Sequence, residues 1–256
     1  MNSDISRLLE EWEYLPGQIA VRKFKAKDGS EKIQLRVDLG ILQMNAEGRP
    51  DGKLPFGHPT LFEHFQHRLE RHTTETGSAE GFKLSAEDCS KLQQEAIQFH
   101  HRYICLYQLK DYTGVLRDTE RNLRVFDFVS KHAESPELSW ALQQLKPQLL
   151  MMQIRARGAQ VLTEEAYDRA IAVVEEGLDQ IRGFYQEVAR PDLIDMSGEL
   201  HSLESWLQEL RSNRPLSARE KLEVALAEAV KREDYEQAAL VRDAIRTLDT
   251  TSANDA

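Results

Sequence analysis

Residues 85–132 read SAEDCSKLQQEAIQFHHRYICLYQLKDYTGVLRDTERNLRVFDFVSKH, and this stretch decides the fold class. Ser85, with Asp88 three residues later, predicts a capping box that opens a helix. A second helix is expected from about Tyr112 to His132, after a very short turn. Two adjacent helices joined in this way predict a helical hairpin at the centre of the chain.

Helices are also expected throughout the rest of the chain beyond this hairpin. Ser135-Pro136-Glu137 starts a third helix, and Pro147 is expected to kink or interrupt it because proline cannot donate a backbone hydrogen bond. Two further helices are expected over about residues 163–189, ending before Pro191, and over about residues 193–211.

Strands are predicted only toward the N-terminus, after a short helix at residues 5–14. IAVRKFKAK at 19–27 alternates apolar and basic residues, and KIQLRVDLGILQM at 32–44 alternates again. Asp28-Gly29 lies between them, so this segment predicts a β-hairpin whose second strand bends or bulges at Gly40.

Composition changes suggest where the domains end. Thr60 opens a helix whose apolar face carries Leu61, Phe62, Phe65 and Leu69, and the stretch Thr73–Gly81 is small, polar and glycine-bearing. The sequence predicts an α+β protein that is mostly α. Its expected parts are a small α/β domain (1–75), a linker (76–84), a helical body (85–211), a C-terminal helical hairpin (216–249) and a flexible tail (250–256).

Charge and composition narrow the function classes. The chain of 256 residues has a formal net charge of −10, of which residues 1–75 carry −1. A strongly negative chain disfavours non-specific binding to nucleic acid, whose affinity comes from neutralised phosphates. No run approaches the roughly 18 apolar residues of a membrane span, and no secretory signal is visible. Cys89 and Cys105 form no CxxC pair, so we expect a cytoplasmic protein without membrane contact.

The C-terminal stretch 221–248, KLEVALAEAVKREDYEQAALVRDAIRTL, contains two amphipathic segments that meet at Glu233-Asp234-Tyr235. Ser217 with Glu220 predicts a capping box at its start, and an apolar face carries Leu222, Ala225, Leu226 and Ala229. This pattern resembles the UVR motif, the helical hairpin of the bacterial excision-repair subunits UvrB and UvrC. LGILQM, GRPDG and PFGHPTLFEHF in residues 39–65 are also similar to the start of uncharacterised bacterial UVR-motif proteins.

The UVR resemblance implies a protein-docking element. The expected function is a non-enzymatic adaptor that holds another protein, linked to DNA repair or protein quality control, and self-association through the hairpin is a further hypothesis. Tyr235 is expected to cap the apolar seam, Ala238-Ala239 to let the helices approach, and Arg242 and Asp243 to bond across the turn or to a partner. The predicted partner-binding residues are Leu222, Leu226, Tyr235, Ala239, Arg242 and Asp243.

An internal echo lies in the helical body. Asp111-Tyr112 continues to Asn122, and Ala166-Tyr167 continues to Gly177, so an aromatic residue is followed ten positions later by a small or polar one. This echo resembles the turn and second helix of a tetratricopeptide repeat, in which the small residue lets neighbouring helices approach. Ordinary antiparallel helices with a chance echo are the alternative interpretation.

No residue pattern names a reaction. The chain lacks the GxxxxGK[ST] loop of an ATPase and paired CxxC zinc sites, and His58, His64, His67 and His72 fit no common metal spacing. We therefore expect no enzyme activity, no metal and no cofactor. The alternative is a nucleic-acid-binding module that uses a basic N-terminal patch with Phe24 and Phe56 for stacking. Its residues are Arg22, Lys23, Lys25, Lys27, Lys32, Arg36, Arg49 and Lys53.

Overall fold

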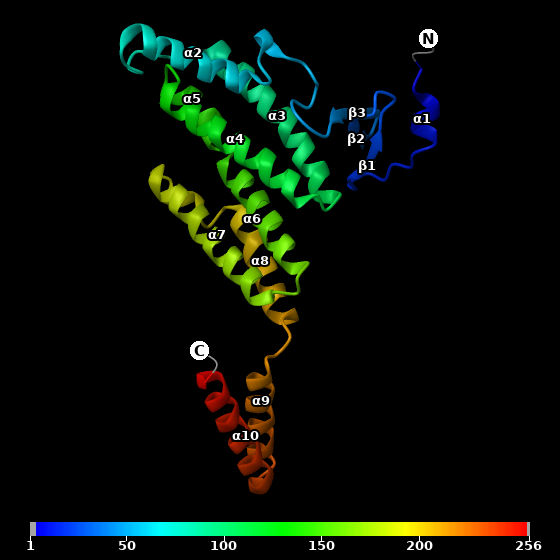
Figure 1. Ribbon diagram of the computed structural model, residues 1–256, viewed down its shortest axis with the longest axis vertical. Helices are drawn as coiled ribbons and strands as arrows, with labels where there is room; N and C mark the ends of the chain where they lie inside the picture. The colour runs from blue at the N-terminus through cyan, green and yellow to red at the C-terminus, as the bar shows by residue number, and fades with distance from the viewer. Residues whose placement is uncertain (1–3, 255–256) are drawn as a thin grey trace. The chain divides into compact units, whose positions relative to one another are not determined.

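The computed structural model describes residues 4–254, with side chains described through Leu248 (Figure 1). The protein is a mostly helical α+β protein, as predicted. The helices are α1 (Ser6–Glu10), α2 (Leu61–Thr76), α3 (Ala86–Gln108), α4 (Tyr112–His132), α5 (Pro136–Gln143), α6 (Lys146–Leu162), α7 (Tyr167–Glu187), α8 (Gly198–Asn213), α9 (Ala218–Lys231) and α10 (Tyr235–Asn254). The strands are β1 (Ala20–Lys25), β2 (Glu31–Val37) and β3 (Gly40–Asn45), and two short 3-10 helices are η1 (Pro55–Gly57) and η2 (Pro191–Leu193).

The N-terminal strands form a three-stranded antiparallel sheet in the order β1-β2-β3. The predicted two-stranded hairpin was therefore wrong in its second strand. Val37 pairs with Gly40, so Asp38 and Leu39 form a two-residue turn, and Gly40 begins a new strand instead of bending an existing one.

One hydrophobic core runs through the sheet and the first helices. Ile33 and Met44 of the sheet belong to the same buried cluster as Phe65 of α2, Leu92 of α3 and Val125 of α4. A small sheet cannot bury a core alone, so it packs on the helices. Residues 1–207 consequently form one compact unit and residues 208–256 a second, which differs from the boundaries expected at 76–84 and 211–216.

Local sequence signals explain several helix ends. Ser85 and Asp88 form the predicted capping box of α3, and Thr60 caps α2 by accepting from the Glu63 backbone N–H at 3.2 Å. Pro147 lies in the first turn of α6 and so separates α6 from α5, as expected. The predicted tail also differs, because α10 continues as helix through Asn254, and residues 255–256 lie outside the described part.

Asn122 and Gly177, the last residues of the two similar stretches in the helical body, lie where helices touch. The Asn122 side chain of α4 donates to the Ala96 carbonyl of α3 at 2.9 Å. A Cβ atom on Gly177 of α7 would lie 2.4 Å from Cδ1 of Ile154 in α6. Both positions therefore set the close approach of a helix pair.

Three helical hairpins turn through a non-glycine residue in the left-handed region, followed two residues later by a tyrosine that starts the next helix. The pairs are Lys110 (φ 59°) with Tyr112, Glu165 (φ 56°) with Tyr167, and Glu233 (φ 59°) with Tyr235. In the first and third turns an aspartate lies between the two. The Asp111 N–H donates to Leu106 O, and the Asp234 N–H donates to Ala229 O, each at 2.9 Å. The C-terminal hairpin therefore turns in the same way as the α3–α4 hairpin.

The two cysteines lie inside the helical core. Cys89 and Cys105 are free thiols and both are buried. Burial raises the pKa of the Cys89 thiol and raises the pKa of Cys105 to about 12. Within residues 4–254, no helix is long and apolar enough to cross a membrane.

Candidate functional site

The C-terminal hairpin is built from α9 and α10, and the predicted capping box of Ser217 and Glu220 starts it. The Glu220 N–H donates to Ser217 Oγ at 3.1 Å, and the Ser217 N–H donates to Glu220 Oε2 at 2.7 Å. Hydrogen bonds from Arg214 and Ser217 lower the pKa of Glu220 to about 2. Asp234 caps the second helix by accepting from the Gln237 N–H at 3.0 Å.

The seam between the two helices is narrow. Over residues 218–248, the buried side chains are Ala229, Ala238 and Val241, and Leu222 and Leu226 are half-buried beside them. Two of the predicted partner-binding residues, Leu222 and Leu226, therefore hold the hairpin together. Their apolar surface is already used within this chain.

The other four predicted residues lie on the outside of α10. Tyr235 is 70% exposed, so the prediction that it caps the seam was wrong. Ala238 is buried but Ala239 is exposed, so only one of the paired alanines lets the helices approach. Arg242 Nε lies 3.7 Å from Asp243 Oδ1, which makes a contact along α10 and not across the turn.

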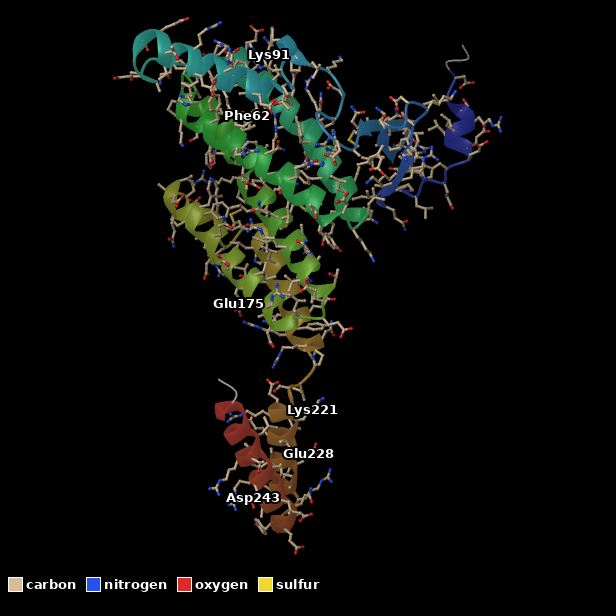
Figure 2. All side chains as sticks on the ribbon, viewed as in Figure 1. Phe62, Lys91, Glu175, Lys221, Glu228 and Asp243 are labelled. Carbon is tan, nitrogen blue, oxygen red and sulfur yellow. The ribbon has the colours of Figure 1, made fainter. Side chains whose placement is uncertain are left out.

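An outward face of α10 combines apolar and acidic groups. At 3.6 residues per turn, Tyr235, Ala239 and Asp243 follow one another along the helix on the side away from the seam. Figure 2 labels Asp243 on this helix. Leu240, which is 66% exposed, lies beside them. A shallow hollow of about 400 Å³ on this face is lined by Asp234, Glu236, Gln237, Ala239, Leu240 and Asp243.

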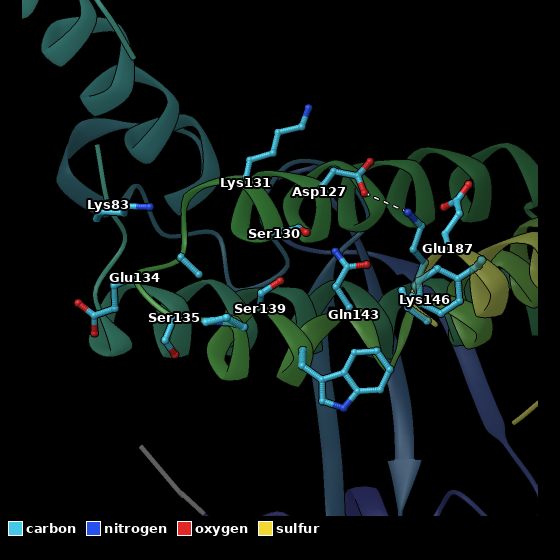
Figure 3. Close-up of a pocket in the computed structure, with 15 residues that line it drawn as sticks. Lys83, Asp127, Ser130, Lys131, Glu134, Ser135, Ser139, Gln143, Lys146 and Glu187 are labelled. Carbon is cyan, nitrogen blue, oxygen red and sulfur yellow. Dashed lines mark hydrogen bonds and ion pairs between the residues drawn. The ribbon is translucent and has the colours of Figure 1, made fainter. Parts of the chain in front are cut away.

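A larger groove of about 570 Å³ lies in the first unit, between α4, α5 and α7 (Figure 3). Lys146 reaches toward α4, and its Nζ lies 3.1 Å from Asp127 Oδ1, while Trp140 and Phe184 supply aromatic surface. The charges of its lining residues balance. Three lysines (Lys83, Lys131 and Lys146) are matched by three carboxylates (Asp127, Glu134 and Glu187). This groove therefore favours no sign of ligand charge.

A buried network of charged side chains lies between α3, α4 and the sheet, and the sequence interpretation missed it. Asp118 accepts from Arg102 at 2.6 and 2.8 Å, and both residues are 1% exposed. Glu95 is also 1% exposed; it accepts from Arg121 and from the Leu61 N–H at 2.7 Å. Arg102 also donates to the carbonyls of Asn45 and Gly48, which ties α3 to the end of the sheet.

One sequence signal pointed to this network. Leu92, Glu95, Phe99, Arg102 and Leu106 recur at helical spacing, so two charged residues lie on an otherwise apolar face of the predicted helix. Charges on a core-facing stripe must be paired with each other or with a ligand.

Three of the four clustered histidines come together in the structure. The His58 ring centroid lies 5.3 Å from that of His64 and 5.4 Å from that of His67, and Phe56 stacks on His64 at 4.3 Å. His72 instead contacts the Glu80 carbonyl at 3.0 Å. Across residues 4–254, no three His, Cys, Asp or Glu side chains are grouped to hold a metal ion.

Four half-buried histidines predict a loss of stability in mild acid. Burial lowers the pKa of His64, His100, His101 and His132 in the folded protein. The unfolded chain has ordinary histidines with a pKa of about 6.5, so it takes up protons more readily as the pH falls. Stability is therefore full above about pH 6.5 and is expected to decrease toward pH 5. Thermal melts at constant ionic strength, with Tm recorded from pH 7.5 to pH 5, measure this.

The combined variant His100→Gln, His101→Gln removes two of these groups. Its Tm should fall less steeply over the same interval than that of the wild-type chain. A wild-type Tm that stays constant between pH 7.5 and pH 5, or an unchanged slope in the variant, contradicts the histidine explanation.

The basic N-terminal patch is largely used in contacts within the chain. Arg22 donates to Gln34 at 2.7 Å and lies 4.2 Å over the Trp12 ring, and Lys23 pairs with Glu31 at 3.0 Å. Arg36 is buried and donates to backbone carbonyls at the β2–β3 turn. These contacts favour a structural role for this part of the patch, and nucleic-acid binding stays a prediction.

Comparison with known proteins assigns this chain to no family. No family model matches the chain, no curated protein matches it, and no solved structure matches it. The UVR-like and tetratricopeptide-like patterns therefore stand as resemblances carried by the residues quoted above.

Proposed function

We propose that this protein is a non-enzymatic adaptor that docks another protein through the outer face of its C-terminal hairpin. The observation that carries the proposal is that this hairpin buries few apolar side chains and exposes several large ones. Three side chains of residues 218–248 are buried, while Val224, Val230, Tyr235 and Leu240 are each about half exposed or more.

The size of the hairpin supports the same conclusion. The hairpin lies in the compact unit of residues 208–256, whose remaining helical part is only the end of α8. Folds close to about 40 residues in length usually need further stabilisation, such as association. A docked partner supplies the missing apolar contact area. Exposed tyrosine and leucine side chains are suited to this role because they bury much area at small entropic cost.

The charge of the face indicates the chemistry of the partner. Leu240 and Ala239 are bordered by Asp234, Glu236 and Asp243. An apolar surface with acidic neighbours is complementary to a partner that presents apolar side chains flanked by lysine or arginine. Such complementarity favours a protein partner over a nucleic acid, whose phosphates this rim repels.

The double variant Tyr235→Ala, Leu240→Ala tests the proposal in the full chain. We expect it to keep its helicity, because alanine favours helices, and to lose at least about tenfold in affinity for the partner recovered from native lysate and then purified. Isothermal titration calorimetry measures the affinity, and light scattering tests whether a second copy is the partner.

The matched control is Leu54→Ala, Phe56→Ala. These two side chains are 68% and 69% exposed and lie outside the hairpin, so partner affinity should not change. Docking through the hairpin is contradicted if the hairpin variant binds the partner as tightly as the control variant does. It is also contradicted if a chain that ends at Pro215 binds the partner as tightly as the full chain.

A further inference from the structure

An arginine ridge runs along one face of α4. Arg117, Arg121 and Arg124 are spaced by four and three residues, which places them in one row on a helix. The row borders a cavity of about 220 Å³ whose other walls come from α2 and α3, including Phe62 and Arg102.

Buried charged side chains surround the cavity. Arg49, Arg102 and Arg121 have side chains no more than 11% exposed, whereas the buried carboxylates are Glu95 and Asp118. Arg49 is also paired with Asp51 at 3.2 Å, so a second, partly exposed carboxylate compensates its charge. Burial lowers the pKa of Arg121 to about 10, against the opposing effect of the Glu95 carboxylate.

Arg121 has hydrogen-bonding capacity left. Its Nη1 donates to Asn122 at 3.0 Å and its Nη2 to Glu95, but its buried Nε has no acceptor among the described residues. Five N–H groups are available on a guanidinium. Two aromatic rings hold this group in place, since its Cζ lies 4.2 Å from the Phe99 centroid and 5.7 Å from the Phe62 centroid.

Arg124 adds a cation at the rim. Its side chain is exposed and has no ion-pair partner within 4 Å in the described part of the chain. By contrast, Arg117 and Arg102 both bind Asp118, so that carboxylate is already compensated. Glu63 is exposed and lies opposite, where its charge opposes an incoming anion.

We propose that this cavity binds the carboxylate or phosphate group of a small molecule, with Arg121 and Arg124 as its principal ligands. Planar guanidinium groups match both oxyanions through paired hydrogen bonds. A volume of about 220 Å³ admits a compact anion with a small organic body, and Phe62 and Phe99 provide a surface for that body. The site lies in the first unit and is independent of the hairpin.

Titration of the full chain with inorganic phosphate and, separately, with acetate tests the proposal. Two-dimensional NMR at constant ionic strength follows the backbone amides of residues 117–124. We expect saturable shifts with at least one of the two anions, and the preferred anion identifies phosphate or carboxylate as the ligand group.

Three single-charge variants decide whether the arginine ridge is responsible. Arg124→Gln should weaken binding about tenfold, as loss of one charge-assisted hydrogen bond predicts. Glu63→Gln should tighten it a few-fold, because it removes a repelling charge. Arg157→Gln, an exposed arginine on α6, should have no effect. Absence of saturable shifts with both anions, or equal binding by Arg124→Gln and Arg157→Gln, overturns the proposal.

Discussion

Replacing Glu95 by glutamine is expected to lower the free energy of unfolding of the first unit by about 3–5 kcal/mol. The Glu95 carboxylate accepts from Arg121 and from the Leu61 and Phe62 N–H groups at the start of α2, and it lies 2.9 Å from Arg49 Nε. A glutamine of the same shape leaves the two arginines buried with one anion fewer. All three tryptophans lie within residues 1–207, so urea denaturation followed by fluorescence reports on this unit.

Glu87→Gln on the same helix is the matched control. Glu87 is 77% exposed and pairs with Lys91 at 2.6 Å, an arrangement whose loss costs less than about 1 kcal/mol. Equal losses for the two variants would show that burial of the Glu95 network adds nothing to stability.

Gly177→Ala is expected to destabilise the α6–α7 pair by about 1–2 kcal/mol, even though alanine is the better helix former. The added Cβ would lie 2.4, 2.5 and 2.9 Å from Cδ1, Cγ1 and Cγ2 of Ile154. Three atoms of one branched side chain are too close at once, so a rotation of its end does not relieve the overlap and the helices must separate. Urea denaturation followed by tryptophan fluorescence measures the change.

Gly183→Ala, on the same helix, isolates the steric effect. Nothing lies within 4 Å of a Cβ at Gly183, so this variant should gain about 0.5–1 kcal/mol. Combining Gly177→Ala with Ile154→Ala should cost less than the sum of the two single changes, because the second change removes the atoms that clash. Additive losses, or a gain from Gly177→Ala, contradict the close-contact explanation.

The parts of the fold that were predictable depend on local signals. The capping serines Ser85 and Ser217 marked the starts of α3 and α9, and Pro147 marked the break before α6. The third strand was missed because Asp38 and Leu39 carry no glycine or proline turn signal. Local sequence also could not show that the sheet shares a core with α3 and α4, since that depends on contacts between Ile33 and residues far along the chain.

The candidate sites were predictable only in part. Periodicity placed Leu222 and Leu226 on one apolar face, but it could not tell whether that face met α10 or a partner. The UVR resemblance assigned Tyr235 to the seam, although its side chain lies on the outer surface. The anion cavity joins residues from three helices, so only the charged positions of Glu95 and Arg102 on an apolar stripe hinted at it.

The left-handed residues at the hairpin turns lower the stability of this protein. Lys110, Glu165 and Glu233 each hold a backbone conformation that costs a residue with a side chain about 1–2 kcal/mol and costs glycine almost nothing. These three hairpin turns keep this strain, although a single-residue change to glycine would release it at each of them. Such strained positions are common in natural proteins, which are held above a stability threshold and not at an optimum. Relieving the strain would raise the free energy of unfolding, and none of the three residues lines a surface proposed to bind.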